Sequence, residues 1–525
     1  MRVWLSGPMG SGKSTVAALV ARRLGYVHVD LDARVEEHAG RSVAELFAEQ
    51  GEAAFRSLER AEALAVLADP ADCVVALGGG AVCDAELRRK LLFSGIVVTL
   101  MATPAELARR VGTAQGRPLL AGDSQAVVSR LERLLAERRP AYAECHACLD
   151  TGGRTSADVA SLVLEVVGRA PLVVPLGERT YTIDVGPGCL AGLPLHLSQA
   201  GVRGKVVLVT DRNVAANWGP RVQSLLATEH ATELVVLEPG EHHKTLASVE
   251  LIWRAALDAG VDREAMLVGL GGGVVGDLCG FAASTLLRGV ALAHVPTTLL
   301  AMVDSAIGGK TGFDTAHGKN LVGTFYQPRF VLSDIETLAS LPVAERTSGL
   351  AEVVKSAWLA GEAAVAALEA DAALLCAGEP DALQRAIRMA AQLKARIVTL
   401  DERESGPRAL LNLGHTVGHA IEASAHYQGL RHGEAVALGM IAAFRVARAL
   451  GQASLADAER MLHLLKAMAL PTELAPHLSD ATFAFMGSDK KRGACHIRYV
   501  VPGAPGQAEQ VSLAVQDIAR MVLGQ

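Results

Sequence analysis

The segment from Gly7 to Ser14, GPMGSGKS, matches the phosphate-binding pattern G-x-x-x-x-G-K-[ST]. It directly follows an apolar strand candidate and directly precedes a helix candidate, which is the context that the pattern requires. The backbone N–H groups of such a loop hold phosphates, Lys13 reaches the outer phosphates, and the Ser14 hydroxyl can ligate Mg²⁺. The candidate contacts to ATP are Gly10, Ser11, Gly12, Lys13, Ser14 and Thr15.

Two carboxylates, Asp30 and Asp32, end a second strand candidate in VHVDLD. They are expected at the sheet edge where ligands bind in open α/β folds. One carboxylate can serve the metal or the attacking hydroxyl, and the other can bind hydroxyl groups of a small polar acceptor. The pair behind the phosphate loop therefore indicates phosphoryl transfer to a small molecule.

A second glycine-rich turn lies in MLVGLGGGVVGD, where a buried-strand pattern meets a helix candidate. Its glycines allow the backbone to approach a dinucleotide pyrophosphate, although GGGVVGD departs from the usual G-x-G-x-x-G fingerprint. The stretch downstream is denser in polar side chains than a core element requires. These side chains are Thr297, Thr298, Asp304, Lys310, Lys319 and Asn320.

His415 and His419 lie four residues apart in LNLGHTVGHAIE, a segment that is otherwise predicted to be helical. A catalytic divalent metal site needs about three protein ligands and an open position. The H-E-x-x-H pattern is absent, and further candidate ligands are Glu352 in GLAEVVKSA and His432 in RHGEAVALGM. Spacing alone does not choose among these four side chains.

Strand and helix candidates alternate over most of the chain, which predicts parallel sheets covered on both faces. The expected strands are 3–6, 26–29, 73–77 and 96–101, then, after a Gly/Pro-rich break at 168–172, 206–210, 234–237 and 266–270. Past about Pro342 the pattern is helical nearly to the end. We therefore expect an α/β class protein with three parts: 1–168, 169–342 and 343–525.

The net charge of −6 arises from 50 basic and 56 acidic residues without long single-sign runs, which argues against a nucleic-acid or membrane-surface protein. No apolar run reaches about 18 residues, so no membrane span is predicted. Eight cysteines without regular spacing favour reduced thiols and a cytoplasmic location. The close pair Cys145 and Cys148 lacks a second pair that would complete a zinc site.

Residues 1–168 resemble shikimate kinases, because GPMGSGKST, DLDARVEE, GEAAFRSLE, ALGGGAV, GRPLL and ERRPAY occur in that family's order. The resemblance implies phosphorylation of shikimate by ATP with Mg²⁺, with Lys13, Asp30 and Arg117 in catalytic roles. Asp30 is expected beside the metal and the acceptor hydroxyl, and Arg117 over ATP from a lid. The residues implied to bind shikimate are Asp32, Arg56, Gly79 and Arg138, the last preferred to Arg139 by counting back from Tyr142.

From about residue 172 to the end, the order of motifs resembles 3-dehydroquinate synthase. The resemblance implies that Zn²⁺ or Co²⁺ is bound by Glu352, His415 and His432, whereas His419 lies in the substrate pocket. The residues implied to bind or adjoin NAD⁺ are Glu241, Lys244, Gly272, Gly273, Asp277, Thr297, Thr298, Lys310 and Lys319. Ser340 stands where the family usually has threonine; a hydroxyl is retained, so little consequence is expected.

The same resemblance implies catalytic roles for Asp304, Lys310, Lys355 and His419. The residues implied to bind substrate are Arg288 from a neighbouring subunit, Asn320, Lys394, Arg408, Asn412 and one of Lys490 and Lys491. The expected reaction converts 3-deoxy-D-arabino-heptulosonate 7-phosphate into 3-dehydroquinate and phosphate, with NAD⁺ reduced and then regenerated. A homodimer formed through the synthase part is also implied.

Three other interpretations of the sequence remain. A related sugar-phosphate cyclase would keep NAD and zinc but alter the groups that meet the substrate, and Lys394, Arg408 and Asn412 favour the dehydroquinate product. A polyol dehydrogenase would release NADH and need no phosphate pocket. The N-terminal part could also be a regulatory nucleotide-binding module without catalysis, although the kinase-type residues are all present.

Overall fold

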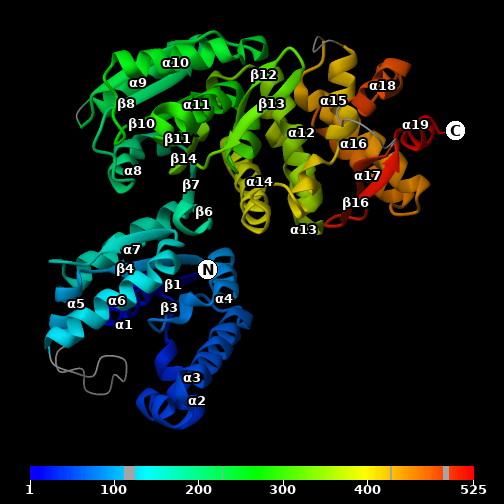
Figure 1. Ribbon diagram of the computed structural model, residues 1–525. Helices are drawn as coiled ribbons and strands as arrows, with labels where there is room; N and C mark the ends of the chain where they lie inside the picture. The colour runs from blue at the N-terminus through cyan, green and yellow to red at the C-terminus, as the bar shows by residue number, and fades with distance from the viewer. Residues whose placement is uncertain (112–123, 228, 426–428, 489–495, 525) are drawn as a thin grey trace. The chain divides into compact units, whose positions relative to one another are not determined.

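The computed structural model describes residues 1–111, 124–227, 229–425, 429–488 and 496–524. The chain divides into two compact units, Met1–Thr182 and Ile183–Gln525 (Figure 1). Among the described residues, no helix is long and apolar enough to cross a membrane. The α/β class expected from the alternating pattern is confirmed in both units.

The first unit is built on a five-stranded sheet in the order β2-β3-β1-β4-β5, and every adjacent pair is parallel. The strands are β1 (Arg2–Ser6), β2 (Val27–Asp30), β3 (Cys73–Ala76), β4 (Ile96–Met101) and β5 (Ala147–Asp150). Trp4 and Leu5 in the central strand are fully buried, as expected for a strand covered on both faces. The first four strands were expected from the sequence.

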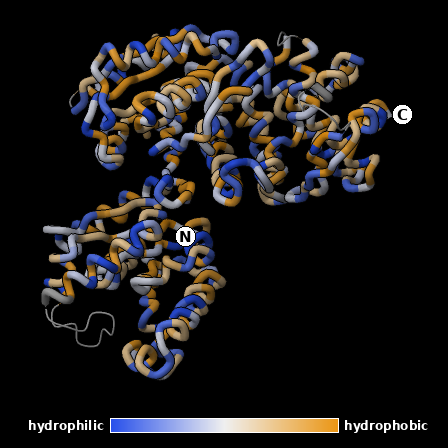
Figure 2. The backbone as a smooth tube through the Cα atoms, in the orientation of Figure 1, coloured by the Kyte–Doolittle hydropathy of each residue, from blue (hydrophilic) through white to orange (hydrophobic). Residues whose placement is uncertain are grey.

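Helices cover both faces of this sheet. They are α1 (Lys13–Leu24), α2 (Leu31–Ala39), α3 (Val43–Ala68), α4 (Ala85–Ser94), α5 (Pro104–Val111), α6 (Ser124–Ala143) and α7 (Ser156–Arg169). Helices α1 and α7 share one hydrophobic core with the strands, whereas α3, α4 and α6 contribute to the core on the other face. Along the helices in Figure 2, hydrophobic and hydrophilic residues alternate, which is typical of helices that bury one face.

The segment that follows α7 belongs to the first unit. Val173, in β6 (Leu172–Val174), is buried in the core that includes Val75 and Tyr142. The Gly177 N–H donates to Glu144 Oε1 at 2.7 Å, and Glu144 Oε2 pairs with Arg88 at 2.5 Å. The boundary between the two compact units, after Thr182, therefore lies beyond the Gly/Pro-rich break at 168–172.

The second unit begins with a parallel α/β layer. Its strands run in the order β7-β14-β11-β10-β8-β9, and β8 to β11 and β14 are mutually parallel where their pairing is defined. They are β7 (Tyr181–Gly186), β8 (Val206–Asp211), β9 (Thr232–Leu237), β10 (Met266–Gly271), β11 (Ala291–Pro296) and β14 (Phe330–Asp334). Helices α8 (Leu193–Gln199) and α9 (Arg212–Leu226) lie in one core, and α10 (Leu246–Asp258) and α11 (Gly273–Thr285) in the other.

A hairpin of β12 (Lys310–Thr315) and β13 (Gly318–Phe325) follows β11. The helical part comprises α12 (Val343–Ala360), α13 (Glu362–Ala377), α14 (Pro380–Leu400), α15 (His415–Ser424), α16 (His432–Ala449), α17 (Leu455–Ala467), α18 (Asp480–Ser488) and α19 (Val515–Leu523). The prediction of helix nearly to the end was incomplete, because β15 (His496–Pro502) and β16 (Ala508–Ala514) form an antiparallel hairpin. Cross-strand neighbours such as Tyr499 and Val511 stabilise it.

Candidate active sites

The phosphate loop connects β1 to α1, so the first N–H groups of α1 face the loop. Lys13 Nζ donates to the backbone oxygens of Gly7 and Pro8 at 2.8 and 2.9 Å, which folds its side chain back over the loop. Ser11 Oγ is buried and has no hydrogen-bond partner among the described residues. Ser14 and Thr15 lie exposed in the first turn of α1. A loop with these donors fits the phosphates of ATP.

The two aspartates differ in environment although they are two residues apart. Asp30 is the N-cap of α2 and accepts hydrogen bonds from the N–H groups of Asp32 and Ala33 at 3.1 and 3.4 Å. Burial raises the pKa of Asp32 above its usual value, although the nearby Lys13 acts in the opposite direction. Both carboxylates therefore lie at the carboxyl end of β2, where the sequence predicted them.

An acceptor-sized cavity of about 310 Å³ lies beside the phosphate loop's sheet edge. Its lining is Glu52, Arg56, Glu59, Arg60, Gly80, Ala81, Cys83, Asp84, Leu87 and Arg138. Arg138 Nη1 donates to the Gly79 carbonyl at 3.0 Å, and Tyr142 Oη donates to the same oxygen at 2.5 Å. Arg139 is exposed, so the position of Arg138 favours it as the shikimate contact. Two arginines in one cavity suit a carboxylate-bearing ligand.

Glu59 belongs to this cavity and was missed from the sequence. Its carboxylate accepts from Arg56 Nη1 at 2.6 Å, and the side chain is 2 % exposed. Burial raises the pKa of Glu59, whereas Arg56 lowers it. The available signal was its i+3 position relative to Arg56 on a helix, which puts both side chains on one face. Arg117, the expected lid residue, lies outside the described residues.

In the second unit, the expected dinucleotide contacts follow the carboxyl ends of strands β9, β10 and β11. The chain order reverses between β8 and β10, and open α/β sheets bind ligands at such a reversal. Gly272 is the N-cap of α11 and directly follows β10, and a Cβ on it would lie 3.1 Å from Thr298 Cγ2. A side chain here would require Thr298 to shift by a few tenths of an ångström, so glycine leaves the backbone open at this turn, which fits the close approach of a pyrophosphate. Gly273, Thr297 and Thr298 lie at the same edge.

Lys244 joins several of the expected cofactor residues. Its Nζ donates to Asp277 Oδ2 at 2.5 Å and to Asn320 Oδ1 at 2.6 Å. Burial lowers the pKa of Lys244, but Asp277 and Glu241 outweigh this effect and the pKa is raised. Lys319 Nζ lies 3.4 Å from Glu241 Oε1. The structure therefore brings the β12–β13 hairpin to the segment of Glu241 and Lys244.

The expected metal ligands converge from three helices. Glu352 comes from α12, His415 from the start of α15 and His432 from the start of α16. Glu352 Oε1 lies 3.4 Å from His415 Nε2 and 3.9 Å from His432 Nε2. Ligand atoms of His415, His419 and His432 lie within 4.8 Å of one another. The distances alone therefore do not exclude His419 as a metal ligand. The spacing of the histidines in the sequence left the same choice of ligands open.

The donor set fits a divalent metal. Glu352 is 1 % exposed, and no hydrogen-bond donor among the described residues reaches its Oε1. An orphaned buried carboxylate oxygen is costly unless a cation or donor compensates it. Lys355 is ion-paired with the other oxygen. Burial, followed by the charge of Lys355, lowers the pKa of His415, so its imidazole is neutral and able to ligate.

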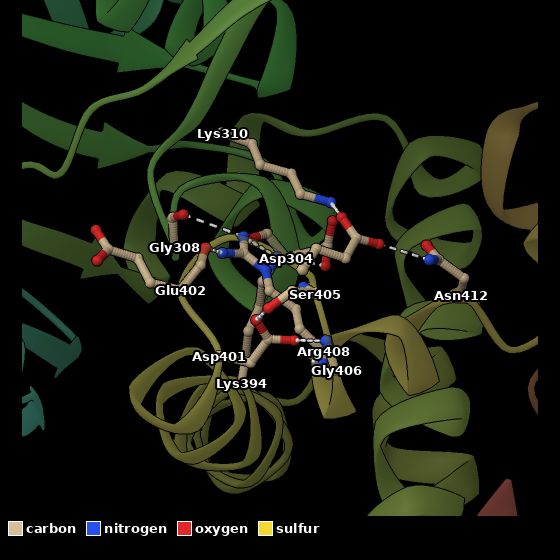
Figure 3. A network of polar contacts seen from close by, with 11 residues as sticks. Asp304, Gly308, Lys310, Lys394, Asp401, Glu402, Ser405, Gly406, Arg408 and Asn412 are labelled. Atoms are coloured by element: carbon tan, nitrogen blue, oxygen red, sulfur yellow. Dashed lines mark hydrogen bonds and ion pairs between the residues drawn. The ribbon is translucent and has the colours of Figure 1, made fainter. Parts of the chain in front are cut away.

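A polar network adjoins these residues (Figure 3). Lys394 Nζ donates to Asp304 Oδ1 at 2.6 Å and to the Asp304 carbonyl at 2.7 Å. Asp304 lies in a single turn of π-helix, a geometry that is frequent at functional sites. Burial lowers the pKa of Lys394 to about 8. Burial raises the pKa of Asp304, but the charges of Lys394 and Lys355 outweigh it and hold the pKa well below its usual range.

The loop after α14 carries the remaining substrate candidates. Arg408 Nη2 donates to the Gly308 carbonyl at 3.0 Å (Figure 3). Glu404, missed from the sequence, pairs with Lys310 and accepts from Asn412 Nδ2 at 2.6 Å. Asp401, also missed, accepts the N–H groups of Ser405, Gly406 and Arg408 and so shapes the loop. The sequence offered only a cluster of acidic residues before Arg408.

Arg288, among the expected site residues that the structure describes, is not joined to these clusters. Arg288 is exposed and forms no hydrogen bond or ion pair with the other expected site residues in the described part of the chain. Lys490 and Lys491 lie outside the described residues. Ser340 Oγ accepts from Trp218 Nε1 at 2.9 Å, so its hydroxyl has a structural role in this chain.

Comparisons with known proteins agree with both units. The shikimate kinase family model matches residues 9–168, and the models of the 3-dehydroquinate synthase N-terminal and C-terminal parts match 234–348 and 349–492. The 3-dehydroquinate synthase of Pelobacter propionicus is 43% identical over 66% of this chain and 97% of its own.

Solved structures resemble the second unit. A 2-deoxy-scyllo-inosose synthase complexed with carbaglucose-6-phosphate, NAD⁺ and Co²⁺ is 25% identical, with a TM-score of 0.61 over 67% of this chain and 99% of that one. A 2-epi-5-epi-valiolone synthase from Streptomyces hygroscopicus with NAD⁺ and Zn²⁺ bound is 28% identical, with a TM-score of 0.59, and the match covers 66% of this chain and 96% of that one.

Fold and sites together define an enzyme with a P-loop kinase unit followed by an α/β and helical unit that carries a candidate metal centre. The chain belongs to the 3-dehydroquinate synthase family and carries a shikimate kinase domain at its N-terminus. It is therefore a fusion of a phosphotransferase domain and a carbon–oxygen lyase domain.

Proposed function

We propose that the protein catalyses two reactions of one biosynthetic route. The first is phosphorylation of shikimate by ATP with Mg²⁺, and the second is conversion of 3-deoxy-D-arabino-heptulosonate 7-phosphate into 3-dehydroquinate and phosphate with NAD⁺ and Zn²⁺ or Co²⁺. The observation that carries the synthase proposal is the convergence of His415 Nε2 and His432 Nε2 on Glu352 Oε1. We assign 1–168 to the kinase, 169–342 to the NAD-binding part and 343–525 to the metal- and substrate-binding part.

In the kinase unit, residues 10–15 of the phosphate loop would bind ATP, and Ser14 would ligate Mg²⁺. Arg56 and Arg138 would bind the shikimate carboxylate from the wall of the cavity. Asp32 would accept hydrogen bonds from the substrate hydroxyls. Asp30 would orient the attacking hydroxyl, and Lys13 would neutralise charge on the transferred phosphoryl group.

In the synthase unit, Glu352, His415 and His432 would hold the metal, and the cofactor contacts would be those around Gly272 and Lys244. When bound, the metal polarises a substrate hydroxyl or ketone, and NAD⁺ accepts and returns a hydride. Lys394, Arg408 and Asn412 would orient the anionic substrate beside Asp304. The ring centroid of His419 lies 5.2 Å from that of His415 and 5.6 Å from that of His432, so His419 is next to the proposed metal ligands. From this position His419 would carry a proton during phosphate elimination.

The dehydroquinate product is preferred to other carbocycles. Relatives named 3-dehydroquinate synthase reach 45% identity, whereas the two cyclase structures with other products reach 25% and 28%. Arg408, Lys394 and Asn412 also supply the charge and hydrogen bonds that a substrate with a carboxylate and a phosphate requires.

We also propose a homodimer formed by the synthase part, with Arg288 reaching the neighbouring site. Leu321, Val322 and Phe325 of β13 expose 58%, 41% and 41% of their surface, and such a group of apolar side chains is typical of an interface. Light scattering on the purified protein tests this proposal, and a monomer at micromolar concentration would contradict it. The cytoplasmic location stays a prediction.

Product identification tests the reactions. The protein is incubated with shikimate and ATP, and separately with the heptulosonate phosphate, NAD⁺ and Zn²⁺, and products are assigned by NMR. We expect shikimate 3-phosphate in the first mixture and 3-dehydroquinate in the second. Turnover of another sugar phosphate, but not of the heptulosonate phosphate, would replace the synthase assignment by that of another cyclase.

A further inference from the structure

Glu422 lies behind the proposed metal centre and has a separate partner for each carboxylate oxygen. Its Oε2 is 3.2 Å from His432 Nδ1, and its Oε1 is 3.7 Å from Lys319 Nζ. The side chain is 6% exposed, so the carboxylate is shielded from solvent. Glu422 is the last residue of HTVGHAIE and lies seven positions after His415, on the same face of α15.

The contact with Glu422 determines how the His432 ring is used. An ionised carboxylate only accepts hydrogen bonds, so His432 Nδ1 carries the proton and donates it. The other nitrogen, Nε2, is then left with its lone pair, and it lies 3.9 Å from Glu352 Oε1. The proton is therefore held on the side of the ring that faces away from Glu352.

His415 is arranged in the same way with a different partner. Its Nδ1 lies 3.2 Å from the backbone carbonyl of Leu413, and its Nε2 lies 3.4 Å from Glu352 Oε1. A carbonyl is also only an acceptor, so His415 also carries its proton on Nδ1. Both imidazoles thus present Nε2 to the same carboxylate oxygen, one held by backbone and the other by the Glu422 side chain.

We propose that Glu422 is a positioning residue that fixes the tautomer and ring orientation of His432 for metal binding. This role rests on the proposed metal centre. Ligating histidines commonly donate their second N–H to a carboxylate or carbonyl, which fixes the ring and raises its basicity as a ligand. Lys319, which also pairs with Glu241, holds the far oxygen of Glu422 and so keeps Oε2 directed at His432.

The test compares metal affinity in the full-length chain after removal of metal with EDTA. Zn²⁺ affinity is measured by competition with a chromophoric chelator, and the Co²⁺-loaded proteins are compared by visible absorption. The variants are Glu422→Gln, which keeps the shape and removes the charge, and Glu422→Ala. The matched control is Glu345→Gln, because Glu345 pairs with Arg431, next to His432, without touching either histidine.

We expect both Glu422 variants to bind Zn²⁺ about 10–100-fold more weakly than the wild type and to change the Co²⁺ absorption bands. The control is expected within about twofold of the wild type, since loss of one exposed pair costs little. Melting temperatures of the metal-free proteins show whether a variant is folded. If Glu422→Ala does not fold, the Zn²⁺ affinity and Co²⁺ spectrum of Glu422→Gln test the role of Glu422.

Two results would overturn the inference in distinguishable ways. Wild-type protein that binds one Zn²⁺ per chain, with Glu422→Gln of equal affinity and an unchanged Co²⁺ spectrum, would refute the role of Glu422 alone. Wild-type protein that binds no Zn²⁺ would refute the proposed metal centre and, with it, this role.

Discussion

Lys394 gives the synthase unit a testable dependence on pH. Its ammonium is buried, and burial lowers the pKa of Lys394 from the usual 10.5 to about 8. The proposed role requires the charged form, because Lys394 would bind an anionic substrate. Since a lysine loses its charge as pH rises through its pKa, about nine-tenths of the side chains are charged at pH 7 and about one-tenth at pH 9.

The measurable quantity is kcat/KM for the heptulosonate phosphate, which reports the ionisation of the free enzyme. We expect it to fall about tenfold per pH unit above pH 8. Asp304→Asn removes the opposing charge 2.6 Å from Lys394 Nζ and so lowers the pKa of Lys394 further. The midpoint of the alkaline limb is expected to move down by about one to three pH units, whatever the loss in maximal rate.

Lys394→Arg is the matched control, because a guanidinium stays charged throughout this range. That variant is expected to have a lower kcat/KM but no limb near pH 8. A wild-type profile that is flat to pH 9.5, or a limb that Asp304→Asn leaves in place, would show that the charge of Lys394 is not required.

Three further predictions concern both units. Lys13→Ala is expected to lower ATP-dependent phosphorylation of shikimate by about 100-fold or more. Phosphate release from the heptulosonate phosphate by the same sample is the control, and equal loss of both activities would contradict separate sites. Glu59→Gln removes the buried, charged partner of Arg56. It is expected to raise KM for shikimate about 10-fold or more without changing KM for ATP, since a charged hydrogen bond contributes about 1.5–3 kcal/mol. An unchanged KM for shikimate would refute the proposal that Glu59 positions Arg56. Gly439→Ala puts a Cβ 1.8 Å from the Gly414 carbonyl oxygen, where α16 meets α15. The variant is expected to lower the free energy of unfolding by about 1–3 kcal/mol and to bind Zn²⁺ more weakly. An unchanged free energy of unfolding in urea denaturation would show that the two helices can move apart without cost.

Much of the fold and of both sites follows from local patterns in the sequence. The phosphate loop was predictable because a strand, a glycine turn and a lysine occur within a few residues. Apolar runs such as that of β10 were equally clear, because a strand buried on both faces has no polar side chains. The helix that begins at His415 was also expected.

The missed elements depend on contacts between distant segments. The strands β15 and β16 depend on pairing with each other and on packing against the helices α16 and α19, and their sequence carries little strand signal next to long helices. Glu404 and Glu422 are ordinary acidic residues in sequence. Their roles follow from Lys310 and His432, which come from other elements and meet them only in the folded chain.

The choice between Glu352 and His419 as a metal ligand is the clearest limit of spacing. His415 and His419 are one helical turn apart, whereas Glu352 is 63 positions away from His415 and reaches it only through packing of α12 against the other helices. The orphaned Oε1 of Glu352 supplies the observation that the sequence did not contain.

The proposed function requires the synthase unit to run a closed redox cycle at the proposed metal centre. Purified protein is given the heptulosonate phosphate, catalytic NAD⁺ and Zn²⁺, and phosphate release is followed together with absorbance at 340 nm. We predict phosphate release without net NADH, and loss of that release in His432→Ala. Stoichiometric NADH, or no phosphate from the wild-type protein, would contradict this cycle.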